Sequence, residues 1–398
     1  MSLNLLFKDH LATRMAYLEK ALQATAFDAL VVSSGQAFTY FADDQDAPFN
    51  TVPHFRHYCP IEGPHHVLKL VPGKKPLLVR YAPEDFWYEQ QPLGAPFWAE
   101  GFDIVEAATL DAVWEAIGQN SRTAYIGNET ERAVAAGLEV NPASITAFLD
   151  WGRSEKTPYE VKCLEEATVL GARGHEAARK AFLAGASELE IHYAYVQGVG
   201  CLDFELAFSS IAALNEKGAT LHYEKKRTDV RQGKVLLMDC GAKVRGYASD
   251  ITRTSAAAFC DSRFQALIAG MNKLELELCD EIKAKVPFGH VHHLAHLKIG
   301  ALLSEAGVLK VGAEEAVAKG LVRPFFPHGL GHHLGIQVHD VAGKLASPDG
   351  TLQAPPAEHP YLRTTRTIDL GHVLTVEPGL YFIPVSYTHL TLPTKRIV

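Results

Sequence analysis

The sequence predicts an α+β protein of two domains, in which a mixed α/β N-terminal domain precedes a larger α+β domain. Its 398 residues exceed the roughly 150 residues of one typical domain. Hydrophobic residues make up 47% and charged residues 21%, as in ordinary globular proteins, so a disordered or collagen-like chain is excluded. Short apolar runs alternate with helical periodicity in the first part of the chain, whereas long helices and hairpins fill the rest.

Residues 1–152 are predicted to form the N-terminal domain. Apolar residues recur at helical spacing over residues 5–25, which predicts an amphipathic helix. Strands are expected at Ala29–Val32, His66–Leu70, Pro76–Arg80, Phe102–Val105 and Thr123–Ile126, with a helix near Leu110–Ile117. The polar stretch Trp151–Pro158 then marks the domain boundary, because Pro158 suits the first turn of a new helix.

The second domain is predicted over residues 153–384. Helices are expected at Pro158–Leu183, after the capping-box residues Ser187 to Glu190, and at Phe264–Val286 and His290–Glu305. Strands are expected at Ala207–Leu214, Val235–Met238 and Leu374–Phe382. This order of helices and hairpins is typical of the α+β class.

Charge and cysteine usage exclude several classes of function. Asp and Glu number 46 against 38 Lys and Arg, and the resulting net charge of −8 argues against a nucleic acid or an anionic membrane as partner. No apolar run has transmembrane length, and the N-terminus carries charges where a signal peptide has its apolar stretch. The six cysteines form no CxxC pair, so we expect a reducing, cytoplasmic setting and no structural zinc site.

Two aspartates flank a predicted hairpin. The apolar strand Val235–Met238 runs into Asp239, and a turn centred on Val244-Arg245 would place Asp250 directly opposite Asp239. Two carboxylates on one face repel each other unless a cation or a proton lies between them. The pair therefore indicates a divalent metal site, and the alternative is an exposed hairpin with two ordinary acids.

Histidines gather in a glycine-rich loop after Phe325-Phe326. The segment Pro327-His328-Gly-Leu-Gly-His332-His-Leu-Gly335 precedes His339-Asp340, and its glycines would let imidazoles converge. A mixed set of imidazole and carboxylate ligands favours Mn²⁺ or Co²⁺, with Zn²⁺ as a further possibility. The alternative is a loop that is merely polar.

A second histidine group opens a predicted helix. It consists of His290, His292, His293 and His296. No acidic residue accompanies the pattern, so we do not expect this group to bind metal in the protein's function.

Glu377 stands alone among apolar residues in the segment Thr375-Val-Glu-Pro-Gly-Leu-Tyr-Phe382. A buried carboxylate without a partner costs several kcal/mol, on the order of 3–5, so such a residue normally has one. Together with Asp239, Asp250 and His332 it completes a candidate ligand set.

The ordered motifs of the chain resemble those of the pita-bread metallopeptidases, the group of methionine aminopeptidase, aminopeptidase P and prolidase. The motifs are Asp239, Asp250-Ile-Thr-Arg-Thr, His328-Gly-Leu-Gly-His332, His339-Asp340 and Glu377-Pro-Gly. Segments Leu214–Tyr223 and Pro360–Arg366 resemble the bacterial Xaa-Pro dipeptidase (prolidase) branch, as do Pro48-Phe49 and Pro53-His-Phe55 in the N-terminal half. The resemblance covers almost all of residues 1–384, and it implies a creatinase/prolidase-type N-terminal domain and a pita-bread catalytic domain.

The resemblance implies a function and a site. It implies metal-dependent hydrolysis of Xaa-Pro dipeptides in a cytoplasmic homodimer, with two divalent metals, Mn²⁺ first and Co²⁺ or Zn²⁺ as alternatives. The implied metal ligands are Asp239, Asp250 as the bridge, His332 and Glu377. His222 and His339 would lie beside the scissile peptide, His328 would be near the metals, and Arg363 would bind the substrate carboxylate.

The C-terminal segment departs from the family pattern. The family has one further bridging Glu beyond the position of Glu377, whereas residues 385–398 contain no Asp or Glu. We therefore interpret residues 385–398 as a non-family tail and the catalytic domain as C-terminally incomplete. Two alternatives to the dipeptidase follow: a catalytically impaired or non-catalytic pita-bread protein, and hydrolysis of organophosphorus triesters as a side activity of the same site.

Overall fold

The computed structural model describes residues 2–383 except 88, 90–91 and 119–120, and the chain divides into two compact units. The first unit runs to Lys162 and includes Ser347–Thr351. The second comprises Cys163–Ala346 and the described residues from Leu352 onward. The tail expected at residues 385–398 lies outside the described residues.

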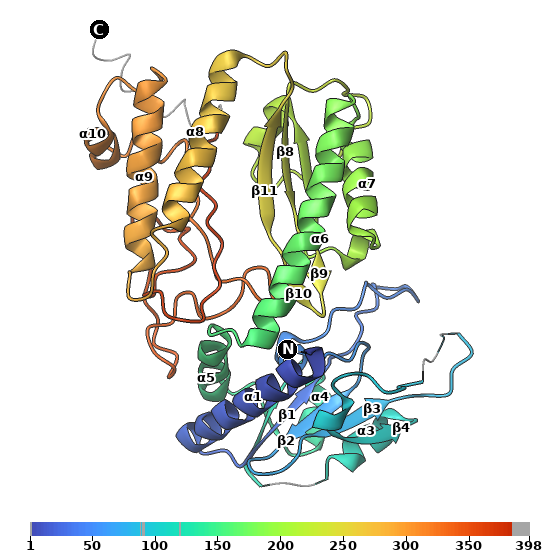
Figure 1. Ribbon diagram of the computed structural model, residues 1–398. Coiled ribbons are helices and arrows are strands. Elements are labelled where there is room, and N and C mark those ends of the chain that lie inside the picture. Colours follow the sequence, from blue (N-terminus) through green and yellow to red (C-terminus); the bar gives the residue numbers. More distant parts are fainter. Residues whose placement is uncertain (1, 88, 90–91, 119–120, 384–398) are drawn as a thin grey trace. The chain divides into compact units, whose positions relative to one another are not determined.

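A six-stranded mixed sheet forms the centre of the first unit (Figure 1). Its strands are β1 (Ala29–Ser33), β2 (Val67–Leu70), β3 (Leu77–Tyr81), β4 (Asp103–Ala107), β5 (Thr123–Ile126) and β6 (Glu139–Val140), in the order β4-β3-β2-β1-β5-β6. Strand β1 pairs antiparallel with β2 and parallel with β5. Every residue of β1 and β5 is buried, as in strands that are covered on both faces.

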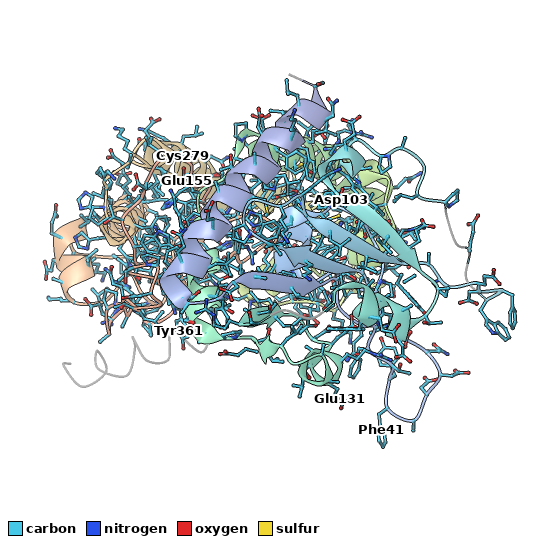
Figure 2. The ribbon with its side chains drawn as sticks, turned by 90° about the horizontal axis from the view of Figure 1, so that it is seen from below. Phe41, Asp103, Glu131, Glu155, Cys279 and Tyr361 are labelled. Atoms are coloured by element: carbon cyan, nitrogen blue, oxygen red, sulfur yellow. The ribbon has the colours of Figure 1, made fainter. Side chains whose placement is uncertain are left out.

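Helices and loops surround this sheet. The helices are α1 (Leu3–Thr25), α2 (Pro53–Tyr58), α3 (Leu110–Ala116), α4 (Thr130–Ala135), α5 (Ala143–Arg153) and the short 3₁₀ helix η1 (Ala99–Gly101). Helix α1 packs against α5, and α3 packs on β3 and β4. The predicted N-terminal helix and the five predicted strands are confirmed, each boundary within two residues. In the loop after β1, Phe41 projects into solvent and is 99% exposed (Figure 2).

A three-stranded antiparallel sheet organises one half of the second unit. Its order is β11-β8-β7, with β7 (Ile211–Leu214), β8 (Val235–Cys240) and β11 (Ile251–Ala256), and the short hairpin β9 (Lys243–Val244) and β10 (Tyr247–Ala248) joins β8 to β11. Helices α6 (Pro158–Leu183) and α7 (Glu188–Val199) share one core with this sheet, through residues such as Phe182, Ile191 and Met238. The predicted capping box is confirmed, since Ser187 accepts from the Glu190 N–H and Glu190 accepts from the Ser187 N–H. The 3₁₀ helices η2 (Asp203–Glu205) and η3 (Asn215–Ala219) flank β7.

The other half of the second unit is a helical layer. Helix α9 (Phe288–Glu305) packs between α8 (Ser262–Cys279) and α10 (Ala313–Ala318), and the three lie side by side in Figure 1. Their core also buries Phe325, Phe326 and Leu330, so the histidine loop that follows is anchored to this layer.

Two predicted elements end differently. Helix α8 stops at Cys279 rather than at Val286, and the chain beyond it turns at Lys285 (φ +72°) and pairs with residues 366–368. The strand predicted at Leu374–Phe382 is not formed with any described part of the chain, where the segment makes one isolated bridge, between Leu374 and His333. The Thr375 and Glu377 N–H groups still donate to the carbonyls of His332 and Leu330, but the His332 N–H donates to the Thr375 hydroxyl, so one position of the pairing uses a side chain.

None of the helices in the described residues is both long enough and apolar enough to cross a membrane.

Candidate metal centre

The hairpin of β8 and β11 carries the two predicted aspartates. Asp239 lies in β8, and Asp250 immediately precedes β11. Asp239 is paired with Thr252, so the prediction that Asp250 lies directly opposite is wrong by two residues. The turn is centred on Arg245-Gly246, whose φ values of 52° and 87° suit a two-residue type I′ turn. A shift of two residues keeps the same face of the strand, so both carboxylates still point the same way.

The environment of Asp239 disfavours the ionised form of its carboxyl group. Burial, and then the like charge of Asp250, raise the pKa of Asp239 to about 7. Its Oδ1 is buried and has no hydrogen-bond partner among the residues that the structure describes. A buried unsatisfied acceptor costs about 1–3 kcal/mol, and a bound cation would remove both this cost and the repulsion.

His332 joins the second aspartate to the glutamate. Its side chain is 5% exposed, and its Nε2 lies 3.3 Å from Asp250 Oδ2 and 3.1 Å from Glu377 Oε1. Its Nδ1 lies 3.0 Å from the carbonyl oxygen of His333 and must donate to it, because a carbonyl only accepts. This bond fixes the ring so that Nε2 faces the carboxylates, as in many metal-binding histidines.

The charge of His332 and the charges of Asp250 and Glu377 stabilise one another. Burial acts to lower the pKa of His332, but the hydrogen bonds to Asp250 and Glu377 outweigh it and raise the pKa to about 10. Burial acts to raise the pKa of Glu377, but its contact with His332 outweighs this effect and lowers the pKa. Without metal, a proton on His332 Nε2 therefore holds the position that a cation would take among three carboxylates.

Backbone contacts fix the two ligand-bearing segments against each other. The Glu377 N–H donates to the Leu330 carbonyl at 2.8 Å, and the Thr375 N–H donates to the His332 carbonyl at 2.9 Å. The Thr375 hydroxyl also lies 2.8 Å from Glu377 Oε1 and orients that carboxylate. Gly331 is required here, since a Cβ at this position would lie 2.1 Å from the Thr375 carbonyl oxygen.

His328 lies at the edge of this group with a partner that sequence reasoning missed. Its Nδ1 donates to the Gly329 carbonyl at 2.8 Å, which leaves Nε2 to accept from the Tyr381 hydroxyl at 3.1 Å. Burial, followed by the charges of Glu377 and Asp239, raises the pKa of Tyr381. Tyr381 therefore belongs to the site as a neutral donor, and its place two residues after Gly379 in the glutamate motif was the available signal.

His339 and Arg363 lie on the exposed side of His332. The rings of His332 and His339 meet edge-on with centroids 4.5 Å apart. Loss of water from the His339 ring, and then the positive charges of His332 and Arg363, lower the pKa of His339 to about 4. Arg363 is exposed and makes no ion pair with any described residue, so its guanidinium is available to a ligand.

The structure does not bring His222 into this group. His222 lies in an exposed turn after η3 and makes no hydrogen bond or ion pair within the described part of the chain. Seven of the eight predicted site residues are thus linked by contacts or mutual electrostatic effects, and His222 is the exception.

Comparisons with known proteins bear on this arrangement. The family described as metallopeptidase family M24 matches residues 162–392, and the family described as Xaa-Pro dipeptidase, N-terminal domain matches residues 5–151. The chain is 41% identical to an Xaa-Pro dipeptidase of Pseudoalteromonas atlantica over 95% of this chain and 87% of that protein. It is 42% identical to an Xaa-Pro dipeptidase of Xanthomonas campestris pv. campestris over 96% and 87%. The chain belongs to metallopeptidase family M24.

Solved structures agree on the fold of this M24 member. Proline aminopeptidase P II of Yersinia pestis is similar with a TM-score of 0.73 and 24% identity, covering 97% of this chain and 90% of that one. A zinc-substituted Escherichia coli aminopeptidase P in complex with product is similar with a TM-score of 0.70 and 21% identity, covering 94% and 90%. The predicted α+β class with a pita-bread domain is therefore confirmed, and the chain is a hydrolase of the metallopeptidase class.

Proposed function

We propose that this protein hydrolyses Xaa-Pro dipeptides to a free amino acid and proline in a metal-dependent reaction. The observation that carries the proposal is the convergence of Asp250 and Glu377 on His332, whose Nε2 lies within 3.3 Å of both carboxylates, beside the raised pKa of Asp239. The identity of 41–42% to Xaa-Pro dipeptidases over nearly the whole chain supports the substrate class.

The donor set fits divalent metals. Asp239, Asp250, His332 and Glu377 supply carboxylate oxygens and one imidazole, and the unpartnered Asp239 Oδ1 gives a metal a ready ligand. We propose that Asp250 bridges two ions, that Asp239 holds one, and that His332 and Glu377 hold the other. Mn²⁺ suits this oxygen-rich set, with Co²⁺ or Zn²⁺ as alternatives. Such ions, when bound, lower the pKa of a water molecule and polarise the scissile carbonyl.

Three histidines are proposed to contact the substrate or to lie near the metals. His339, whose low pKa keeps it neutral above about pH 4, would donate a hydrogen bond to the peptide beside His332. His328, whose two ring nitrogens are held by the Gly329 carbonyl and the Tyr381 hydroxyl, would lie near the metals and position the Tyr381 hydroxyl there. His222, an exposed residue of the turn after η3, has a proposed place beside the scissile peptide.

Arg363 is the proposed receptor for the substrate carboxylate. Its guanidinium is exposed, forms no ion pair among the described residues, and lies close enough to His339 to lower that residue's pKa. A guanidinium can bind a free carboxylate with two parallel hydrogen bonds. A receptor that binds the C-terminal carboxylate beside the metal centre would select dipeptides over longer peptides.

Partners and location belong to the same proposal. All six cysteines are free, which suits the reducing cytoplasm. The net charge of −8 offers no surface for nucleic acid or an anionic membrane. By its resemblance to the prolidase branch, we propose a homodimer.

A direct assay tests the function. Purified protein with Mn²⁺ is expected to release proline from Ala-Pro, to lose this activity with a chelator, and to regain it when Mn²⁺ is added. Ala-Pro-Ala is the matched control and should be cleaved far more slowly. Equal cleavage of the two peptides would refute the dipeptidase proposal, and metal binding without any cleavage would favour the non-catalytic alternative.

A further inference from the structure

Three histidines outside the candidate centre meet beside the helical layer. His292 and His296 lie one turn apart on α9, and His359 comes from the loop that precedes Arg363. One ring nitrogen of each lies within 4.8 Å of the others. The ring centroids are 4.4–4.7 Å apart. The α9 histidines have no acidic partner in the sequence pattern, and the imidazole of His359 that meets them is distant in the chain.

The buried imidazoles lack the hydrogen bonds that their burial demands. His292 and His296 are 2% and 1% exposed. Neither ring nitrogen of His292 and not the Nε2 of His296 has a hydrogen-bond partner among the described residues. An unsatisfied buried polar group costs about 1–3 kcal/mol, so a cluster of them indicates a missing ligand.

These imidazoles are neutral, which is the form that binds metal. Burial first, and then the neighbouring histidines, lower the pKa of His292 to about 2 and that of His296 to about 3. The charged groups that act on the cluster are Arg323 and His293, which lower the pKa of His359, and Glu358, which raises it. A neutral nitrogen lone pair is thus available on each ring at physiological pH.

The dimensions suit a small transition-metal ion. Zinc binds imidazole nitrogen at about 2.0–2.1 Å in tetrahedral geometry, which places ligand nitrogens about 3.3 Å apart. The three nitrogens would need to close by at most about 1.5 Å, a change within reach of side-chain rotation. The loop of His359 is at the surface: His359 is half-buried, and Tyr361, labelled in Figure 2, is 70% exposed.

We propose that His292, His296 and His359 form a zinc-type metal site, separate from the candidate centre of Asp239, Asp250, His332 and Glu377. An all-imidazole set favours Zn²⁺, Co²⁺, Ni²⁺ or Cu²⁺ over the hard ion Mn²⁺. Three protein ligands leave the fourth position to water.

A metal ion at this site would link the loop of residues 359–363, which carries the proposed substrate receptor Arg363, to α9. The Leu362 N–H donates to the His359 carbonyl at 3.1 Å, so Arg363 lies at the end of the turn that the metal holds. Phe326 contacts His292 and His296 on one side and His328 on the other, with ring centroids 5.7, 5.0 and 4.9 Å apart. This positioning role, unlike the metal site itself, rests on the proposed function.

Zinc binding to single-residue variants of the full chain tests the site. His359→Gln changes a half-buried loop residue, so the fold should survive, and His296→Gln changes an α9 ligand. His290→Gln is the matched control, because this histidine lies exposed on the same helix. We expect zinc affinity at this site to fall by about a hundredfold or more in the first two variants and to stay unchanged in the control. With Co²⁺, the visible absorption of a site with imidazole ligands should disappear in parallel.

Asp250→Asn separates the two centres. It should leave zinc at the histidine site unchanged, and an Asp250→Asn protein that retains no zinc would overturn the proposal. Equal zinc affinity and stoichiometry in His359→Gln and His290→Gln would overturn it as well. If His359→Gln loses a metal and Asp250→Asn loses none, this site stands and the proposed catalytic centre fails. In active protein, His359→Gln should raise KM more than it lowers kcat.

Discussion

At the scale of single residues, Asp250 is the proposed bridge between the two metal ions. Its carboxylate lies 3.3 Å from His332 Nε2, and its charge raises the pKa of Asp239. We expect Asp250→Asn to lower metal-dependent turnover by at least about a hundredfold, since one bridging ligand serves both ions. Asp340→Asn is the control, because Asp340 accepts from the Val341 N–H and holds no proposed ion. Kinetics at saturating Mn²⁺ measure both, and equal losses contradict the assignment.

Arg363 makes a second residue-scale prediction. We expect Arg363→Ala to raise KM for Xaa-Pro dipeptides by about tenfold to a hundredfold, the worth of a charge-assisted hydrogen bond of about 1.5–3 kcal/mol. Bound metal should not change, since Arg363 is outside the ligand set. Arg363→Lys should recover part of the lost substrate affinity, because lysine keeps the positive charge but lacks the paired N–H donors of the guanidinium. An unchanged KM in the alanine variant would remove Arg363 from the site.

At the scale of elements, the contact of the histidine loop with the Glu377 segment holds the site together. We expect Gly331→Ala to destabilise the protein by about 1–3 kcal/mol or more, because its Cβ would lie 2.1 Å from the Thr375 carbonyl oxygen. Gly289→Ala on α9 has open space around its Cβ and should be neutral or slightly stabilising. Thermal denaturation compares the two variants, and equal midpoints would contradict the close packing.

The same elements show what the sequence could predict. The ligand types and their order were readable because local motifs carry them, and Asp250, His332 and Glu377 do meet. The hairpin register was not readable, because only the positive φ of Arg245 and Gly246 shows where the turn lies. The segment Leu374–Phe382 has the pattern of a strand, but pairing depends on a distant partner. His359 was missed for the same reason, since its partners lie more than sixty residues earlier in the chain.

At the scale of the whole molecule, buried neutral histidines make stability depend on pH. Burial is the first cause that lowers the pKa of His57 to about 3, of His66 to about 4 and of His175 to about 4. Below the ordinary value of 6.5 the unfolded chain binds protons that the folded chain excludes. The free energy of unfolding therefore decreases as the pH is lowered below 6.5. Each group contributes up to about 1.4 kcal/mol per pH unit until the pH reaches its pKa in the folded protein.

A substitution of His66 tests this pH dependence of stability at one residue. Its Nδ1 accepts from the Tyr81 N–H at 3.1 Å while its Nε2 donates to the Glu62 carbonyl at 2.9 Å, so a proton on Nδ1 breaks a buried bond. We expect His66→Gln to lose less stability than the unaltered protein between pH 6.5 and about 4, as measured by urea unfolding with a chelator present. His332, whose pKa is raised, acts in the opposite direction in both proteins, so the difference between them is the quantity to compare. Identical pH profiles would contradict the account of His66.

The most direct test of the central claim is the position of bound metal. Crystals grown with Mn²⁺ and measured at the manganese absorption edge give an anomalous signal that locates each ion. We predict a peak within ligand distance of Asp239, Asp250, His332 and Glu377, and its loss in Asp250→Asn crystals. Manganese bound elsewhere, with His332 still in contact with Asp250 and Glu377 and no ion among the four side chains, would contradict the claim that they form the metal centre.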